Sequence, residues 1–396
     1  MLEVVLHDRA RWREHLLPLV YTRPVGDLRL GILTLHEKWQ HLFSTKVSFY
    51  TAPYLQQKFP LPSSAAASYL VIRANILPTT GLVNALIALP TQSVLYGSDG
   101  DWLAYHINRW EEEPVLADLQ QVLFSEEAVS IHFLEDIYRL NRDQLLHDYA
   151  LLTQQQTSAL LHDSNQVFGQ QLFVCAGVTA FGSTFNTVDG PIYLGAGAVI
   201  EEGAYLKGPL AICASARVKT GSRLYPNVTI GPAATIAGEV NNAVLWGNCA
   251  KGHEGYLGCA VIGEGCNLGA GTSNSNLQNN WSTVKLHDYH VAGLRDTGVQ
   301  KVGTFMGDYA MCGVNSTITT GNIIGVGAQI AMSNIIPKFV ADFCWLTDKK
   351  TAIYRWQKFE AMLHARAAIK NEQLSSLDLE ILKTVFNTST VEREEY

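Results

Sequence analysis

Residues 188–236, VDGPIYLGAGAVIEEGAYLKGPLAICASARVKTGSRLYPNVTIGPAATI, carry an aliphatic residue at every sixth position. The nine residues in register are Val188, Leu194, Ile200, Leu206, Ile212, Val218, Leu224, Ile230 and Ile236. A period of six matches neither the 3.6 residues of an α-helical turn nor the alternation of a single strand. It is typical of a three-sided coil, in which each side is a short strand with one aliphatic residue pointing into a narrow core. The segment therefore predicts a parallel β-helix.

The same period continues beyond this segment. It resumes, shifted by two residues, at Val244, Ala250, Tyr256, Ile262 and Leu268, and it returns at Met306, Cys312, Ile318, Ile324, Ile330 and Ile336. The break at residues 273–300 predicts a loop that leaves the coil. After Pro337, helical spacing and a capping box at Ser375 and Asp378 predict helices that cover the end of the coil.

The first 160 residues have a different pattern, which is typical of a mixed α/β domain. Strands are expected at 2–6, 47–50 and 69–76, and helices at 33–43 and 134–152. We expect these elements to form a parallel, three-layer arrangement. The chain then divides into an α/β domain at 1–165, a β-helix at 166–340 and a helical tail at 341–396.

Composition limits the functions that the chain can have. Its 29 Lys and Arg residues against 36 Asp and Glu residues give a net charge of -7, which offers no general attraction to nucleic acid or to an anionic membrane. The chain begins with no signal-peptide pattern, and no stretch approaches the roughly 20 apolar residues of a membrane span. We therefore expect a cytoplasmic protein. The seven cysteines lack Cys-x-x-Cys spacing, so we expect buried thiols.

Residues 251–276 contain the side chains that are best suited to catalysis or ligand binding. They include Lys251, His253, Tyr256, Asn267, Ala270, Gly271 and Asn276. This pattern resembles the acetyltransferase half of the GlmU family, which are bifunctional UDP-N-acetylglucosamine pyrophosphorylases and glucosamine-1-phosphate N-acetyltransferases. The spacing from His253 to Tyr256, Asn267 and Asn276 matches that family, and Arg223 falls where the family has a phosphate-binding arginine. The resemblance implies a left-handed β-helix and a homotrimer with acyl sites between neighbouring coils.

The chemistry of acetyl transfer assigns a role to each of these residues. An amino sugar must lose a proton before its nitrogen attacks a thioester, and a histidine, with an unperturbed pKa of about 6.5, is suited to accept that proton. We expect His253 to be this base. The phosphate of the substrate requires cationic partners, for which Arg223, Lys251 and Lys285 are candidates.

Uncharged groups complete the predicted site. Tyr256 and Asn267 are expected to hold the sugar, and Ala270, Gly271 and Asn276 to contact acetyl-CoA. The predicted substrates are thus acetyl-CoA and an amino-sugar phosphate such as glucosamine 1-phosphate. Asn241 stands where the family has a further substrate-binding lysine, so the acceptor sugar stays open.

Residues 16–25, LLPLVYTRPV, resemble the opening of sugar-nucleotide pyrophosphorylases. In that family a Gly-rich phosphate loop precedes the segment, because only glycine lets the backbone approach phosphates closely. Here residues 7–13 lack glycine, Val25 replaces the family's lysine, and Asn75 stands near its metal-binding Asp. Arg9, Arg11, Arg13 and Arg23 are alternative phosphate ligands. We expect nucleotidyl transfer, with Mg²⁺ and a nucleoside triphosphate, to be weak or absent, and the coil to keep acetyl transfer without residues 1–165.

Three other functions compete with this interpretation. The chain could be a sugar-1-phosphate nucleotidyltransferase whose coil serves only for oligomerisation. It could be a β-helix metalloenzyme with His253, His287 and His290 as zinc ligands, which requires three imidazoles to converge on one ion. It could also be a scaffold without catalytic activity, which leaves the cluster at 251–276 unexplained.

Overall fold

The computed structural model describes residues 2–389, which form two compact units. The first unit contains the chain up to Arg13 together with Thr22–Leu28 and Leu33–His132. The second contains Glu14–Tyr21, Arg29–Ile32 and the chain from Phe133 onward. Each unit is described by itself.

The first unit is a six-stranded mixed sheet with the order β2-β1-β3-β5-β4-β6. Its strands are β1 (Leu2–His7), β2 (Val47–Tyr50), β3 (Ser68–Arg73), β4 (Ser93–Tyr96), β5 (Trp102–Ile107) and β6 (Gln120–Leu123). Strand β1 pairs in parallel with β2 and β3, whereas β5 is antiparallel to both β3 and β4. The three strands expected from the sequence, β1, β2 and β3, are thus parallel, whereas the sheet as a whole is mixed. A short turn in which the Gly97 amide donates to the Asp101 carbonyl joins β4 to β5, and so short a link permits only antiparallel pairing.

Two helices accompany this sheet, α1 (Leu35–Phe43) and α2 (Thr80–Ala88). Helix α1 begins after Thr34, whose side chain accepts from the Glu37 amide while the Glu37 carboxylate accepts from the Thr34 amide. This capping box fixes the start of α1 within two residues of the predicted position.

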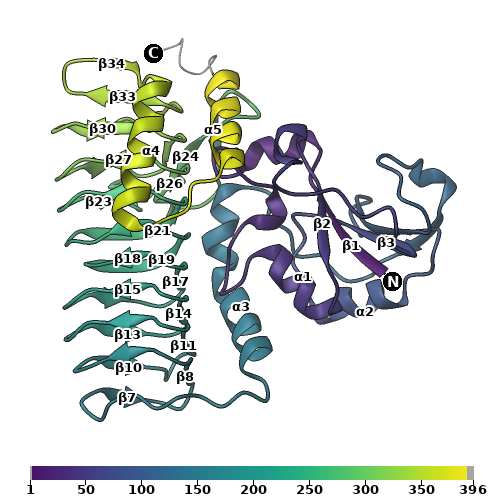
Figure 1. Cartoon of the computed structure of the whole chain (residues 1–396), viewed down its shortest axis with the longest axis horizontal. Coiled ribbons are helices and arrows are strands. Elements are labelled where there is room, and N and C mark those ends of the chain that lie inside the picture. The colour runs from purple at the N-terminus through teal and green to yellow at the C-terminus, as the bar shows by residue number, and fades with distance from the viewer. Residues whose placement is uncertain (1, 390–396) are drawn as a thin grey trace. The chain divides into compact units, whose positions relative to one another are not determined.

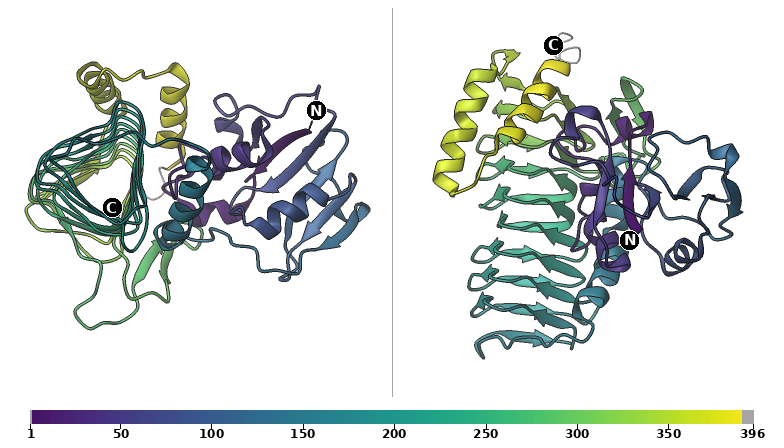
Figure 2. Two further views of the ribbon diagram at one scale, coloured as in Figure 1. Left: turned by 90° about the horizontal axis from the view of Figure 1, so that it is seen from below. Right: turned by 45° about the vertical axis from the view of Figure 1, so that its right-hand side comes forward.

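The second unit is built on a parallel β-helix, which confirms the predicted architecture (Figure 1). Figure 2 shows its three-sided cross-section. One side contains β7 (Gln166–Phe168), β10 (Thr184–Asn186), β13 (Tyr205–Lys207), β16 (Arg223–Leu224), β23 (Ser273–Asn274), β28 (Thr317–Ile318) and β31 (Ile335–Ile336). The next contains β8 (Leu172–Val174), β11 (Ile192–Leu194), β14 (Leu210–Ile212), β17 (Val228–Ile230), β26 (Thr304–Met306), β29 (Asn322–Ile324) and β32 (Phe339–Val340).

Two longer strands, β19 (Glu239–Leu245) and β21 (Tyr256–Ile262), bend around the corner between those sides. The third side contains β9 (Thr179–Ala180), β12 (Val199–Ile200), β15 (Arg217–Val218), β18 (Thr235–Ile236), β20 (Ala250–Lys251), β22 (Asn267–Leu268), β27 (Met311–Cys312), β30 (Gln329–Ala331), β33 (Cys344–Thr347) and β34 (Thr351–Ile353). Successive coils pair in parallel on each side, and only β34 runs antiparallel, to β33.

The predicted interior residues from Leu194 to Ile236 and from Met306 to Ile336 are buried, as expected. Val188 is 68% exposed, so the first predicted position is wrong. The register of the middle segment is also wrong at its start. Ile230 pairs with Leu245 and Ile236 with Lys251, so these residues share the inward face, rather than Val244 and Ala250 one position earlier.

Helix α3 (Leu134–Thr153) explains this misjudged register. It packs along β14, β17, β19 and β21 on the outside of the coil. Its Leu145 forms a buried cluster with the outward-facing Ala211 and with Cys213 and Ile32. Because these strands are covered on both faces, apolar residues occur at both inward and outward positions. The alternation of apolar and polar residues along a strand then no longer identifies the residues that face the interior of the coil.

The chain leaves the coil after β23, close to the predicted break at 273–300, and forms the antiparallel hairpin β24 (Lys285–Asp288) and β25 (Gly293–Asp296). Arg295 anchors this hairpin through a bidentate pair with Glu135, at 2.8 Å for each bond, and a bond of 3.1 Å to Asp288. The hairpin is therefore held to the start of α3 rather than left free.

Two helices follow the coil, α4 (Trp356–Lys370) and α5 (Ser376–Thr388), and lie beside its last turns (Figure 2). The predicted capping box at Ser375 and Asp378 is present. Six of the seven cysteines are buried and all are free. Within residues 2–389, no helix has the length and apolar character needed to cross a membrane.

Candidate functional site

The turn 252–255, here called the His253 turn, protrudes because of a difference in length between neighbouring coils. Ile236 pairs with Lys251, and Glu239 pairs with Tyr256. Two residues of the lower coil thus lie opposite four residues of the upper coil. The additional residues bulge outward, and the side chains of His253 and Glu254 are exposed. The local fold therefore presents an imidazole and a carboxylate to solvent.

Arg223 lies below this turn on the same side of the coil. It pairs directly with Glu239 in the next coil, and its guanidinium is 3.9 Å from the Glu239 carboxylate and 3.5 Å from the Glu254 carboxylate. All three side chains are more than 40% exposed, so these ion pairs add little to stability. They do gather one cation and two anions next to His253, which can complement a substrate with both a phosphate and an ammonium group.

Sequence reasoning missed Glu239. The residue immediately precedes the interior Val240, as Arg223 precedes Leu224 and Tyr256 precedes Leu257. In the correct register of the coil, Glu239 therefore occupies the same outward position as Arg223 and Tyr256. That shared position is the signal in the sequence that could have identified it.

Tyr256 and Asn276, twenty residues apart in sequence, are brought together. The Asn276 side-chain amide donates to the Tyr256 hydroxyl at 3.0 Å and to the Cys259 thiol at 3.4 Å. Burial raises the pKa of Tyr256, and Cys259 and Glu239 contribute in the same direction. The phenol consequently keeps its proton and can donate to an oxygen of a bound sugar.

The turn containing Ala270 and Gly271 stacks on the His253 turn. The Gly271 amide donates to the Glu254 carbonyl at 3.1 Å. Its φ is +74°, and a Cβ atom there would lie 2.2 Å from the Asn315 side-chain oxygen, so glycine is required. Because the Gly271 N–H is already bonded, it stabilises the neighbouring turn rather than pointing freely at a thioester.

Asn267 lies on a different side of the coil from Tyr256. It is exposed on β22, opposite Ala250 of the preceding coil and Met311 of the following one. The structure thus brings Arg223, His253, Tyr256, Ala270, Gly271 and Asn276 onto neighbouring turns and strands, whereas Asn267 faces another side.

The two lysines do not lie where the sequence suggested. Lys251 is fully buried and points into the coil, which corrects the expectation that it contacts a phosphate. Its partner position in the coil below is Ile236, so its direction follows from the register. Lys285 is exposed at the start of the hairpin, where its carbonyl accepts from the Lys338 ammonium at 3.3 Å. Among the described residues, it forms no hydrogen bond or ion pair with the other candidates.

In the first unit, Asp8 follows β1 at the place of the missing glycine loop. Its buried carboxylate accepts from the Val25 amide at 2.6 Å and from Arg13 Nε at 3.2 Å. Burial raises the pKa of Asp8, although Arg13 opposes the shift. Asn75, which follows β3, is also buried and donates to the Ile131 carbonyl at 3.0 Å. These side chains close the carboxyl edge of β1 and β3 instead of leaving an open phosphate loop.

The neighbouring arginines are engaged as well. Arg9 bonds to Tyr50 and pairs with Glu112, and Arg23 pairs with Asp27. A phosphate would have to compete with these carboxylates, which weakens the alternative in which arginines replace the glycine loop.

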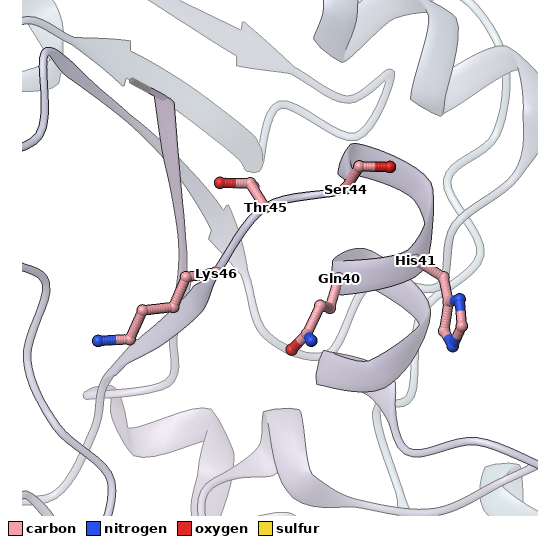
Figure 3. A pocket seen from close by; sticks show the side chains of 5 residues that line it. All are labelled: Gln40, His41, Ser44, Thr45 and Lys46. Carbon is pink, nitrogen blue, oxygen red and sulfur yellow. The ribbon is translucent and has the colours of Figure 1, made fainter.

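A polar hollow lies elsewhere in this unit, lined by Gln40, His41, Ser44, Thr45 and Lys46 (Figure 3). The side chains of His41 and Lys46 point away from one another, so no cationic groups converge there. The hollow is at the connection from α1 to β2, which is the amino end of a parallel strand. Ligands of such sheets bind at the carboxyl ends, so this hollow is a poor candidate for a nucleotide site.

The geometry also argues against the metalloenzyme. No group of three His, Cys, Asp or Glu residues within 2–389 is placed to hold a metal ion. His287 stacks on Phe339 with 3.8 Å between ring centroids, and His290 Nδ1 lies 2.8 Å from the Glu14 carboxylate. Both imidazoles of the hairpin thus have structural contacts of their own.

Comparison with known proteins relates the chain to sugar-nucleotide enzymes. Residues 4–157 match the family model for sugar nucleotidyl transferases. A bifunctional protein GlmU from Cyanothece sp. is 26% identical over 273 residues, which are 60% of this chain and 53% of that protein. A bifunctional sugar-1-phosphate nucleotidylyltransferase/acetyltransferase from Sulfurisphaera tokodaii is 31% identical over 162 residues, which are 36% of this chain and 40% of that protein.

The matches cover about half or less of the length of these relatives. Among solved structures, a UDP-N-acetylglucosamine acyltransferase from Francisella novicida aligns with 60% of this chain and 88% of its own, at 15% identity and a TM-score of 0.27. The chain is thus similar to sugar nucleotidyl transferases over residues 4–157 and to bifunctional GlmU proteins over 60% of its length.

Proposed function

We propose that the chain is an acetyl-CoA-dependent N-acetyltransferase of an amino-sugar phosphate, with glucosamine 1-phosphate as the first candidate, in the synthesis of UDP-N-acetylglucosamine. The observation that carries the proposal is the exposed His253 turn beside Arg223 and Glu239. An amino-sugar phosphate carries a cation and an anion, and this cluster offers a counter-charge for each. The relatives named as GlmU and as a nucleotidylyltransferase/acetyltransferase favour the same substrate class.

The reaction assigns each group a step. Arg223 binds phosphate oxygens, for which a guanidinium is well suited. Glu239 and Glu254 attract the substrate ammonium, and the His253 imidazole accepts its proton. The freed amine nitrogen then forms a bond to the thioester carbonyl carbon, and the carbon–sulfur bond breaks. The second proton that the nitrogen loses goes to the sulfur, so that CoA leaves as the thiol. The Tyr256 hydroxyl, oriented by Asn276, donates to the sugar.

We also propose that the chain acts as a homotrimer, with the site between neighbouring coils. The candidate side chains lie on the outer surface of the coil, so a single chain forms only one wall of the site. A second wall would exclude water and strengthen the charged contacts.

A second candidate function is sugar-1-phosphate nucleotidyl transfer, which the family match over residues 4–157 favours. That reaction would need Mg²⁺ and a nucleoside triphosphate. The buried Asn75 and the Asp8–Arg13 pair at the carboxyl edge of the sheet disfavour it.

One screen separates the two functions. Thiol release from acetyl-CoA is measured with glucosamine 1-phosphate and other amino-sugar phosphates, and pyrophosphate release is measured with UTP or dTTP and sugar 1-phosphates. Thiol release that depends on an amino-sugar phosphate supports the proposal. Pyrophosphate release without thiol release would replace it with the second function.

A further inference from the structure

Lys251 is a charged residue in a row of otherwise aliphatic interior side chains. Along the third side of the coil, Ile200, Val218, Ile236 and Lys251 pair in succession and point inward. All four are at most 1% exposed. Burial of an ammonium group costs free energy unless polar groups accept hydrogen bonds from it. This lysine therefore requires an explanation beyond packing.

The explanation lies in the corner of the coil next to the lysine. In the lower coil, three residues separate the interior Ile236 from the interior Val240, whereas in the upper coil five separate Lys251 from Leu257. The corner of the upper coil is therefore longer than the corner directly below it, which contains Ala237 and Gly238. An added Cβ at Gly238 would lie 3.2 Å from the Lys251 Nζ, so the lysine side chain extends into this corner.

Inside the corner, the ammonium group joins the two coils. Lys251 Nζ donates to the His253 carbonyl at 2.9 Å and to the Ala237 carbonyl at 3.4 Å. The Ala237 amide in turn donates to the Lys251 carbonyl at 2.7 Å. The residue that bears the candidate base is thus bonded through its backbone to a side chain in the core.

The other bonds of the His253 turn hold its far end. The Gly255 carbonyl accepts from the Glu239 amide at 3.2 Å, and the Glu254 carbonyl accepts from the Gly271 amide. Lys251 supplies the side-chain contact at the His253 carbonyl. Without it, the near end of the bulge would lose its side-chain hydrogen bond to the His253 backbone.

We propose that Lys251 is a positioning residue for the acetyl-transfer site, whose ammonium group, from inside the coil, fixes the His253 turn. This inference rests on the function proposed above. Charged groups that face the turn from neighbouring elements are Glu254 itself, Glu239 on β19 and Arg223 on β16. Burial lowers the pKa of Lys251 to about 8, and Glu254 opposes the shift, which agrees with an ammonium held in the core without a close counter-ion.

Lys251→Met tests the proposal, because it keeps the length and apolar stem of the side chain and removes its donors. A well-packed apolar residue in place of a buried charge is often neutral or stabilising, so we expect a melting temperature equal to or above that of the wild type. We expect kcat for acetyl transfer to fall about 10- to 100-fold, because a small misplacement of a catalytic group has that effect. Amide hydrogen exchange at Gly252–Gly255 should become faster.

Ile236→Met is the matched control, since it changes the paired interior position in the coil below and leaves the His253 carbonyl bonded. It should preserve kcat, melting temperature and exchange of the turn. Lys251→Leu provides a second variant should Lys251→Met fail to fold, because Leu268 occupies the same inward row one coil above.

Three results would overturn the proposal: unchanged kcat in Lys251→Met, reduced kcat with unchanged exchange of the turn, or reduced kcat with a lowered melting temperature, which indicates a purely structural role. The exchange measurement needs no substrate. If the wild type shows no acetyl transfer, the proposed function fails, while exchange of the turn still decides whether Lys251 fixes it.

Discussion

The Lys251 ammonium group and the His253 carbonyl oxygen lie 2.9 Å apart, and this contact connects the interior of the β-helix to the exposed His253 turn. A buried cation at such a place has a measurable thermodynamic consequence. Desolvation favours its neutral form in the folded chain, whereas the unfolded chain leaves it in water.

The first prediction concerns stability against pH. Burial lowers the pKa of Lys251 to about 8 in the folded protein, below the value of about 10.4 for an unfolded lysine. Between these values the unfolded state binds more protons, so the lysine's contribution to the free energy of unfolding increases as pH rises from about 8 to 10.4, by up to about 3 kcal/mol. Below pH 8 this contribution is lost. Urea denaturation across this range measures it.

Tyrosines and cysteines also titrate at alkaline pH, so the informative quantity is the difference between wild type and Lys251→Met. Any stability advantage of the variant should shrink as pH rises. A difference that stays constant from pH 7 to 10.5 would show that Lys251 titrates normally, and Ile236→Met should give such a constant difference.

The second prediction is that His253→Ala lowers kcat by about 10²–10⁴-fold, the usual contribution of a general base. KM for the sugar phosphate should change little, because the neutral imidazole adds little to the binding of an anion. Steady-state kinetics with folded protein test this. If kcat of His253→Ala stays near the wild-type value, His253 is not the general base, and Glu254 or a bound water would have to accept the proton.

The third prediction is that Arg223→Ala raises KM more than it lowers kcat. A phosphate contact is present in both the ground state and the transition state, so its loss weakens binding of both. Arg217→Ala is a matched control, because Arg217 is an exposed arginine of the same coil that pairs with Glu201 at 2.9 Å. It should leave both constants unchanged. Equal effects of the two substitutions would mean that Arg223 is only a surface ion pair.

The period-six pattern was sufficient to predict the coil, because Leu206 and Ile324 are buried by the chain's own stacking and need no other information. It failed at Val244, because α3 covers the outward face of β19 and β21, and at Lys251, because corner length changes between coils. Neither fact is visible in a single repeat. The deletion of residues 1–165 also has a structural consequence that the sequence pattern did not indicate. Helix α3 and Arg29–Ile32 belong to the second unit, and their removal would uncover Ala211 and Cys213.

The fourth prediction is a trimeric mass in solution. The candidate side chains line one exposed surface, and a closed cyclic assembly is a common way to complete such a site. Size-exclusion chromatography with light scattering at micromolar concentration should give three times the mass of the chain. A strictly monomeric protein that still transfers acetyl groups would show that one coil is enough and would refute the shared site.

The fifth prediction is that the intact chain releases little or no pyrophosphate from UTP or dTTP with a sugar 1-phosphate and Mg²⁺. Mg²⁺ favours carboxylate ligands, but at the carboxyl edge of the first sheet Asn75 supplies a neutral amide, whose nitrogen donates to the Ile131 carbonyl. One oxygen of the Asp8 carboxylate, Oδ2, accepts from both Arg13 and the Val25 amide. Asp8→Asn should therefore reduce stability by about 1–3 kcal/mol, the usual effect of disturbing a buried charged hydrogen bond, without changing acetyl transfer by the folded fraction. Robust Mg²⁺-dependent pyrophosphate release that Asp8→Asn abolishes would instead make Asp8 a catalytic residue and restore the first unit as an active enzyme.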